Sequence, residues 1–551
     1  MFEVIVSGIA NLFISAISRA TGRKPGKVSP ESVADIGPGT VSKAVFDLIE
    51  WSFMWLEREI RDSRFGSMSK RAISLMREKV PPLPLRIDIP FLKGQKSKTL
   101  ASPLMFIVGF VAFMGLSDHG ISPFALWSIV ASLAAYFIGT RVAKVRFGDL
   151  PERYSPYILT CLAISAAGYF LIGETAARLS LIPLFLILFS RRYGAKVSLC
   201  ALAVGYLMLK NANFSIGFPY AFFGVLGLAR NFHTERLALA IERNAYSIAA
   251  FMIFIGALYW VLDIALVGRI PLLTSREGLD PSFTMKSHLL PIGSVLFVSL
   301  LGEWGSRTGN AGRARTLSVL TIAFATVLMA FLGYRTQVLI TLVAAILVAI
   351  VWDLITVSEL LVSGSAIVAI FAFMTVMRTY TTGANVGLLE SISVRAGLTL
   401  DIYDMMAHLG GYLGFTKGQT LIACITSFAT LMPGLAFSPR RYVAVFAGAG
   451  GISMTSTIFG PFALDFGLVG VVLIMAVFGF FMQMEHNLLG TTTGRRRCVV
   501  AFLYSMTLGY MLIGIETGLV DYEVLLLFAA SFLYSLYLSQ FAPSKALHKV
   551  K

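Results

Sequence analysis

The chain has 551 residues, of which 56% are hydrophobic and only 14% are charged, and its formal net charge is +16 at pH 7. A chain this apolar, with repeated runs near the length that crosses a hydrocarbon core, is not a soluble globular domain; it is typical of an all-α polytopic membrane protein. The positive charge is better explained by cytoplasmic loops that face anionic membrane lipids than by binding to nucleic acid, which we exclude as a partner.

An extended hydrophilic region precedes the apolar runs. Between residues 45 and 60, apolar side chains recur at helical spacing among acidic and basic ones, which predicts an amphipathic helix lying on the membrane surface. Four prolines between residues 81 and 90 prevent a long helix before the first crossing. We therefore divide the chain into a cytoplasmic or interfacial N-terminal region, residues 1–100, and a multi-span domain, residues 101–551.

The apolar runs of the second region predict about 14 transmembrane helices. They are residues 102–117, 122–140, 156–173, 178–190, 197–210, 214–229, 245–267, 289–302, 317–332, 336–352, 359–377, 461–484, 498–514 and 522–541. Several are shorter than the roughly 20 residues of a straight crossing, so we expect some to be tilted or broken.

The basic residues orient these helices. With an even number of crossings, six basic clusters fall on the same side as the N-terminal region, and the positive-inside rule makes that side cytoplasmic. The clusters are Arg141/Lys144/Arg146/Arg153, Arg191/Arg192/Lys196, Arg230/Arg236/Arg243, Arg307/Arg313/Arg315, Arg495/Arg496/Arg497 and Lys545/Lys549/Lys551. The prediction is a multi-pass protein of the cytoplasmic (plasma) membrane with both termini inside.

Two of the external loops are unusually long, residues 268–288 and residues 378–460. The second contains the apolar stretches 419–431 and 442–449, which predict short or re-entrant helices packed at the outer leaflet. An alternative makes these stretches a pair of full crossings, which would leave the orientation unchanged. Long external loops are where we expect function, because the other external connections have only a few residues.

A set of arginines on the external side needs a reason, since topology does not favour positive charge there. These are Arg269, Arg276, Arg335, Arg378, Arg395, Arg440 and Arg441, and Lys417 adds a further external cation. Our leading explanation is an anionic ligand presented from the outer half of the bilayer. Arg335 is the sharpest case, because a guanidinium in a tight turn at the membrane boundary is costly unless it is paired or binds an anion. Contact with lipid headgroups is the alternative, and it is strongest for Arg378, Arg440 and Arg441.

The richest stretch of titratable residues lies between Arg395 and His408. If it is helical, Asp401, Asp404 and His408 share one face, which is the spacing that lets a carboxylate orient an imidazole acting as a general base. Histidine suits that work because the pKa of an imidazole lies near neutrality. The alternative is that Asp401 caps the helix and His408 is a polar surface residue. Three loosely spaced groups are weak evidence for a metal, and we predict none.

Familiar enzyme motifs do not occur in this sequence. A P-loop, a GxGxxG in a βαβ unit, an HExxH and a GxSxG are all missing, which removes the usual support for soluble nucleotide chemistry, zinc proteolysis and α/β-hydrolase catalysis. The four cysteines are scattered without CxxC spacing, so they form neither a disulfide framework nor a metal site.

Three features of residues 330–485 resemble the O-antigen, or oligosaccharide repeat-unit, polymerases. They are the Gly-Tyr-Arg335-Thr turn that opens a span, the long external loop with its own arginines, and the sequence GPFALDFGLVG that begins at Gly460. The resemblance implies a glycosyltransferase without a cofactor that joins polyprenyl-diphosphate-linked oligosaccharide repeat units on the outer face of the membrane. It also implies membrane lipids, and a chain-length regulator or a flippase, as partners.

The resemblance also assigns roles to residues. A diphosphate leaving group needs fixed positive charge, which the external arginines and Lys417 would supply without a metal. The acceptor hydroxyl needs a base, for which His408, Asp404 and Glu390 are the candidates, with Asp401 assisting. Asp465, inside the GPFALDFG sequence, would orient an arginine or the acceptor sugar. Its alternative role is a favourable negative charge near a helix N-terminus.

Two alternatives remain at this level. A secondary transporter or flippase for a lipid-linked or anionic substrate would also have many crossings and external arginines. An O-antigen ligase would use the same kind of donor but transfer the finished glycan to a different acceptor.

Overall fold

A computed structural model describes residues 95–117, 120–143, 156–164, 193–210, 214–231, 234–272, 279–355, 388–420, 439–448 and 454–518, with single positions elsewhere. Nearly all of the N-terminal region, including the predicted amphipathic helix, lies outside the described residues. The predicted spans 156–173, 178–190, 359–377 and 522–541 lie wholly or partly outside them.

Every long element of the described chain is an α-helix. These are α6 (Gln95–Gly115), α7 (Pro123–Val142), α11 (Gly194–Lys210), α12 (Phe214–Asn231), α13 (Thr234–Arg243), α14 (Ala245–Val267), α15 (Pro281–Ser287), α16 (Leu289–Thr308), α17 (Ala311–Phe331), α18 (Arg335–Val351), α20 (Leu388–Gly410), α22 (Pro439–Phe446), α23 (Gly460–Thr491) and α24 (Gly494–Thr517). The predicted all-α class is confirmed.

Six helices within the described ranges are long and apolar enough to cross a membrane. They are α7, α14, the joined α15 and α16 from Ser282 to Thr308, α17, α23 and α24. Residues Met105–Gly115 of α6 and the whole of α18 form shorter apolar helices. These elements make a multi-pass membrane protein, whereas the number of 14 crossings and their orientation stay predictions.

Several helices continue beyond the apolar runs that predicted them. Helix α16 extends to Thr308 instead of ending near residue 302, and α17 begins at Ala311, six residues before the predicted start. Arginine, glutamate and alanine have high helix propensity, so the helix persists where hydropathy falls. The connection between the two helices is a tight turn at Gly309, which has a φ of 73°.

The packing centres on α24, which is buried along most of its length and contacts α16, α18, α23 and α6. A helix that is apolar on all sides and buried in this way is the centre of a bundle. Helices α7 and α23 approach closely at glycines: a Cβ atom at Gly479 would lie 1.9 Å from the carbonyl oxygen of Tyr136. Only glycine allows that contact.

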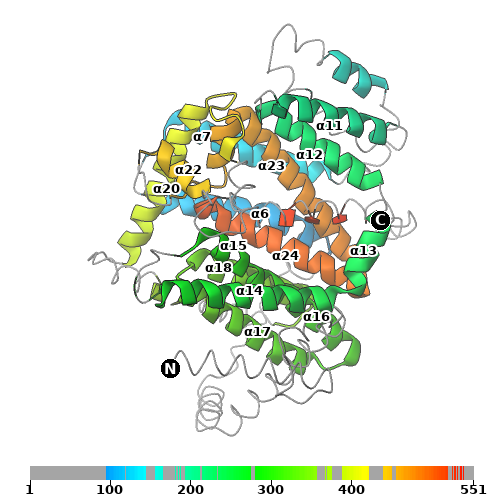
Figure 1. Cartoon of the computed structure of the whole chain (residues 1–551), viewed down its shortest axis with the longest axis vertical. Helices are drawn as coiled ribbons and strands as arrows, with labels where there is room; N and C mark the ends of the chain where they lie inside the picture. Colours follow the sequence, from blue (N-terminus) through cyan, green and yellow to red (C-terminus); the bar gives the residue numbers. More distant parts are fainter. Residues whose placement is uncertain are drawn as a thin grey trace.

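Helices α20 and α13 lie at opposite ends of the bundle (Figure 1). Figure 1 shows α14 and α24 running across the view, with α20 along one side and α13 along the other. At the α20 end, Arg395 of α20 pairs with Glu516 in the last turn of α24. At the α13 end, Glu242 of α13 pairs with Arg496 in the first turn of α24. We refer to these as the α20 end and the α13 end.

Helix α23 is broken near the α20 end. Gly467 has a φ of 65° and a ψ of −168°, so the helix is interrupted there. The turn that follows α20 fills the break: the N–H of Phe415 donates to the carbonyl of Leu464 at 2.8 Å, and the N–H of Leu468 donates to the carbonyl of Gly411 at 2.9 Å. These bonds satisfy peptide groups that the interruption would otherwise leave without partners.

Candidate functional site

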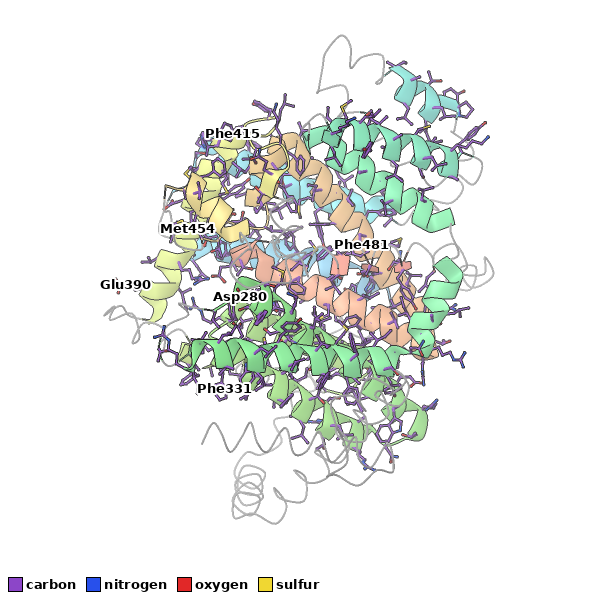
Figure 2. The ribbon with its side chains drawn as sticks, in the orientation of Figure 1. Asp280, Phe331, Glu390, Phe415, Met454 and Phe481 are labelled. Carbon is purple, nitrogen blue, oxygen red and sulfur yellow. The ribbon has the colours of Figure 1, made fainter. Side chains whose placement is uncertain are left out.

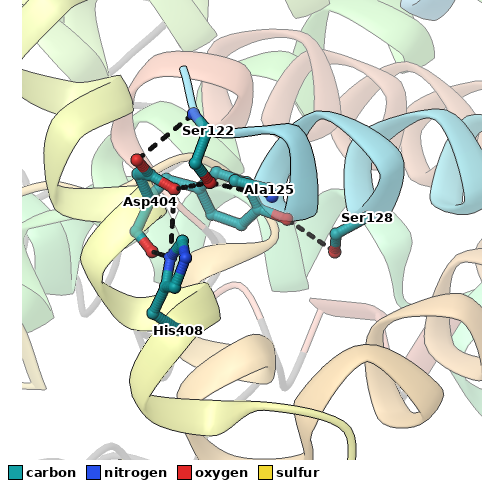
Figure 3. A network of polar contacts seen from close by, with 6 residues as sticks. Ser122, Ala125, Ser128, Asp404 and His408 are labelled. Carbon is teal, nitrogen blue, oxygen red and sulfur yellow. Dashed lines mark hydrogen bonds and ion pairs between the residues drawn. The ribbon is translucent and has the colours of Figure 1, made fainter.

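The central feature of the α20 end is a histidine held by an aspartate one turn earlier on α20. The Nδ1 atom of His408 lies 2.9 Å from the carbonyl oxygen of Asp404 and 3.2 Å from its carboxylate Oδ1 (Figure 3). The side chain of His408 is 56% exposed, so its ring is accessible. The helix predicted between residues 395 and 408 is confirmed as part of α20.

These contacts define which ring nitrogen carries the proton. The closer partner of Nδ1 is the backbone carbonyl oxygen of Asp404, which can only accept, so Nδ1 donates. In the neutral imidazole the lone pair therefore resides on Nε2 of His408. A carboxylate that holds an imidazole in this tautomer also stabilises the imidazolium that forms when the ring takes a proton.

A serine from a distant part of the chain completes the pair. Ser122 donates its hydroxyl to Oδ1 of Asp404 at 2.5 Å, and its N–H lies 3.3 Å from Oδ2. Ser122 is also the N-cap of α7 and accepts the N–H of Ala125 at 3.3 Å. Since that cap uses a lone pair of the Ser122 oxygen, its own hydrogen is available to Asp404. Ser122 thus contacts both carboxylate oxygens of Asp404.

Tyr403 ties the same part of α20 to α7. Its buried hydroxyl donates to Oγ of Ser128 at 2.7 Å (Figure 3). Burial raises the pKa of Tyr403, so the hydroxyl stays protonated and keeps this bond. The hydrogen bonds of Tyr403 and Asp404 to Ser128 and Ser122 help to position the helix that carries His408.

Other candidates on α20 lie away from this pair. Arg395 is two and a half turns before Asp404, at about 3.6 residues per turn, and so lies on the opposite face, where it pairs with Glu516. Glu390 is exposed near the start of α20, at the edge of the molecule (Figure 2). At about 1.5 Å rise per residue, it is roughly 27 Å along the helix from His408. Asp401 is exposed and has no part in the network around His408.

Arg335 begins α18 at the α20 end, beside a buried polar group. The neighbouring Tyr334 packs its ring edge-on against His288, with 5.8 Å between ring centroids. His288 is buried, and its Nδ1 lies 3.1 Å from Nε2 of Gln337, whose Oε1 lies 3.5 Å from the hydroxyl of Tyr510. The Arg335 side chain itself is half-buried.

The loop predicted at 268–288 is shorter than predicted, because the membrane-length helix formed by α15 and α16 begins at Ser282, and an aspartate holds this start to α14. Fully buried Asp263 accepts the hydroxyl of Thr284 at 2.6 Å and the N–H of Asp280 at 3.1 Å. Asp280 in turn caps α15. Lys286 donates to Oγ of Ser282 at 2.5 Å.

Asp465 is fully buried at the break in α23. It accepts the hydroxyl of Thr416 at 2.5 Å and the N–H of Thr420 at 3.1 Å, so it holds the turn after α20. Lys417 is exposed in that turn and has a φ of 53°, which is uncommon for a residue other than glycine. The proposed contact of Asp465 with an arginine or a sugar stays a prediction.

Of the remaining predicted cations, three lie within the described residues and two lie outside them. Arg440 and Arg441 begin α22, and this helix packs on α20 through a cluster that contains Val443, Ile402 and Met406. Exposed Arg269 follows the end of α14. Arg276 and Arg378 lie outside the described residues. Within the described chain, no three histidine, cysteine or acidic side chains gather as metal ligands do.

Sequence reasoning missed the partners of the predicted residues. The Ser-Pro pair at the start of α7 is a recognisable helix-start signal and could have identified Ser122 as a cap. Nothing local indicates that Ser122 also binds Asp404, which is 282 positions away. Glu516, the partner of Arg395, was missed for the same reason.

The comparisons with known proteins agree with the resemblance seen in the sequence. A family described as "Putative O-antigen polymerase" matches residues 99–528. The uncharacterized protein MJ0419 of Methanocaldococcus jannaschii is 26% identical over 305 residues, which cover 55% of this chain and 79% of that protein. No solved structure matches the chain.

Proposed function

Because the chain belongs to the O-antigen polymerase family, we propose that it is a polymerase that joins lipid-diphosphate-linked oligosaccharide repeat units on the outer face of the cytoplasmic membrane. The family implies a lipid-linked glycan as the substrate. The observation that carries the proposal is the Asp404–His408 pair at the α20 end, where an accessible imidazole has its Nε2 available to take a proton.

In the proposed reaction, Nε2 of His408 takes the proton of an acceptor hydroxyl. The oxygen freed of its proton forms a bond to the anomeric carbon of the donor sugar. The bond between that carbon and the phosphate oxygen breaks, and its electron pair leaves with the polyprenyl diphosphate. Asp404 orients the imidazole and stabilises the imidazolium that results, while Ser122 holds Asp404.

The leaving diphosphate needs fixed positive charge, which the arginines of the α20 end supply in this proposal. Arg440 and Arg441 begin α22, which packs on α20 through Ile402 and Met406, and they are proposed for this role from their charge alone. Arg335 is at the same end of the bundle, at the start of α18. Guanidinium groups match phosphate oxygens with paired hydrogen bonds, so this chemistry requires no metal.

The broken helix α23 also suits the alternative of a secondary transporter, because such proteins bind substrate at interrupted helices. In α23, however, peptide groups at the break are bonded to the protein's own backbone. Val469 donates to the carbonyl of Tyr412, and Leu464 accepts from Phe415 and Thr416. The break therefore fixes the turn after α20, which favours a rigid active site over a translocation pathway.

A reaction with purified protein tests the proposal. Given a lipid-diphosphate-linked repeat unit and no nucleotide sugar, the protein in detergent or liposomes should produce a ladder of longer lipid-linked glycans, because the glycosyl-phosphate bond supplies the energy. The ladder should persist in EDTA. A ligase would extend the glycan only onto a distinct acceptor, and a transporter would move the substrate across a sealed bilayer without changing its mass. Either result in place of the ladder would refute the polymerase.

A further inference from the structure

Two aromatic rings continue from the imidazole of His408 across the surface of the α20 end. The ring of Phe124 lies 5.6 Å from that of His408, centroid to centroid, and the ring of Tyr412 lies 5.6 Å from that of Phe124 at an interplanar angle of 82°. Phe124 comes from the first turn of α7, and Tyr412 comes from the turn after α20. Three segments of the chain thus meet in one row of rings.

The outer member of this row is open to its surroundings. Tyr412 is 65% exposed and Phe124 is half-buried beneath it. The exposed ring of Tyr412 presents an apolar face, and the imidazole and the carboxylate beside it are polar. Such a surface suits a ligand that has an apolar face and polar groups.

The backbone that carries Tyr412 is held in one conformation. The carbonyl of Tyr412 accepts the N–H of Val469 at 3.3 Å, and Gly411 and Gly414 on either side have φ values of 53° and 91°. A Cβ atom at Gly414 would lie 2.2 Å from the carbonyl oxygen of Asp465, so this turn fits the break in α23 only with glycine there. Because the turn is already ordered, binding at Tyr412 costs little further loss of backbone freedom.

We propose that Tyr412 and Phe124 form the binding platform for the acceptor sugar, with the apolar C–H face of its ring against Tyr412 and a hydroxyl directed to Nε2 of His408. A sugar ring has an apolar face and polar edges, which matches an exposed aromatic ring beside an imidazole. This inference rests on the proposed function and names the residues that position its acceptor. Membrane lipid is the competing occupant, since aromatic side chains also collect at membrane interfaces.

The chain offers a matched control for this distinction. Phe415 is 56% exposed and lies in the same turn as Tyr412, but its ring packs against Phe446 of α22 at 5.9 Å instead of against the Phe124–His408 row. If lipid were the occupant, loss of either exposed ring should have a similar effect. If the acceptor sugar is the occupant, loss of Tyr412 alone should matter.

The experiment uses the full-length protein with two substrates. The donor is the intact lipid-linked oligosaccharide fraction extracted from the source cells, and the acceptor is the glycan released from that fraction by mild acid, which has lost the diphosphate and can only accept. In Tyr412→Ala we expect the KM for the released glycan to rise roughly 3- to 10-fold with kcat nearly unchanged, as expected for loss of one aromatic contact. Tyr412→Phe keeps the ring and should keep the KM, and Phe415→Ala should resemble the wild type.

The outcomes separate this inference from the function on which it rests. An unchanged acceptor KM in Tyr412→Ala, with normal ladders, would overturn the platform and leave the polymerase in place. Equal losses in Tyr412→Ala and Phe415→Ala that appear only in liposomes would assign the rings to lipid and also overturn it. A wild-type protein that makes no ladder from the lipid-linked fraction would overturn both. Each variant's yield and elution profile in detergent report whether it folds.

Discussion

The two ends of the bundle use charged residues in different ways. At the α13 end, the carboxylate of Glu242 accepts hydrogen bonds from Nε and Nη2 of Arg496, at 3.0 and 3.4 Å. It also accepts a hydrogen bond from the hydroxyl of Tyr534 at 2.9 Å. Nearby, Arg497 donates to the carbonyl of Val351 at 3.2 Å. At the α20 end, Asp404 is equally well bonded, but no described residue binds Nε2 of His408.

The ion pairs of the α13 end thus have a structural role, whereas the Asp404–His408 pair can exchange a proton with a ligand in the proposed reaction. Where these cations meet a carboxylate or a carbonyl, their contacts hold helices together. Where a carboxylate orients an exposed imidazole, one nitrogen remains for a proton from outside. A similar contrast exists at the α20 end itself, where His288 is buried against the amide of Gln337 while His408 is exposed beside a carboxylate.

We expect the two ends of the bundle to face opposite sides of the membrane. In a protein freed of its natural cysteines, Lys417→Cys should react with an impermeant thiol reagent added to intact cells, whereas Arg313→Cys should react only after permeabilisation. Both positions are exposed. Labelling of Arg313→Cys from outside would reverse the orientation and remove the external active site.

Loss of the imidazole should produce the largest effect on turnover. In His408→Ala we expect the rate of polymer formation to fall by about 100-fold or more, as for loss of general-base catalysis, with donor binding retained. The measurement is the initial rate of ladder formation by purified protein. Normal rate and polymer length in this variant would show that His408 is not the base.

Changing the carboxylate should have a somewhat smaller effect. In Asp404→Asn, the amide can donate to Nδ1 of His408 and favour the wrong tautomer, so we expect a loss of roughly 10- to 100-fold in turnover. Asp401→Asn is the matched control, because Asp401 is on the same helix but outside the network. Equal activity of the two variants would show that Asp404 does not orient the imidazole.

Arginines at the two ends should differ in their effect on activity. Arg335→Lys at the α20 end should lose most activity, roughly 10-fold or more, because an ammonium cannot reproduce the paired hydrogen bonds of a guanidinium to phosphate. Arg496→Lys at the α13 end should retain activity. Both proteins should insert into the membrane at normal levels. Wild-type turnover by Arg335→Lys would make Arg335 a structural residue.

The smallest expected effect is on stability at the α13 end. Arg496→Ala removes two hydrogen bonds from Glu242, and we expect the apparent melting temperature in detergent to fall by about 2–4 °C with activity near the wild-type level. A thermal unfolding curve beside a rate measurement checks both. A large loss of activity without a change in stability would contradict a purely structural role for this end.

Much of the fold followed from local pattern. The span predicted at 245–267 coincides with α14, because an uninterrupted apolar run has few alternatives to a buried or membrane helix. Helix ends were less predictable, since polar residues with high helix propensity extend α16 and α17 past the apolar runs. The break at Gly467 was not predicted, because a glycine in an apolar run does not by itself interrupt a helix.

The contacts of the candidate site were also predictable only where they join residues close together in the chain. The pairing of Asp404 with His408 was accessible from sequence because residues four apart on a helix are neighbours. Arg395 was predicted as a ligand for a diphosphate, and its pairing with Glu516, 121 positions away, could not be anticipated. The role of Asp465 in holding the turn at Thr416 and Thr420 was equally hidden.

The helical membrane class, the long polar stretches between spans and the face of α20 that carries Asp404 and His408 could be predicted from the amino-acid sequence. Each of these depends on composition or on spacing within one helix, where geometry is known in advance. Three features are visible only in the folded chain: Ser122 holds Asp404, Tyr412 and Phe124 align with His408, and the turn after α20 fills the break in α23. These contacts join residues far apart in the chain, and only the packing of whole helices brings such residues together.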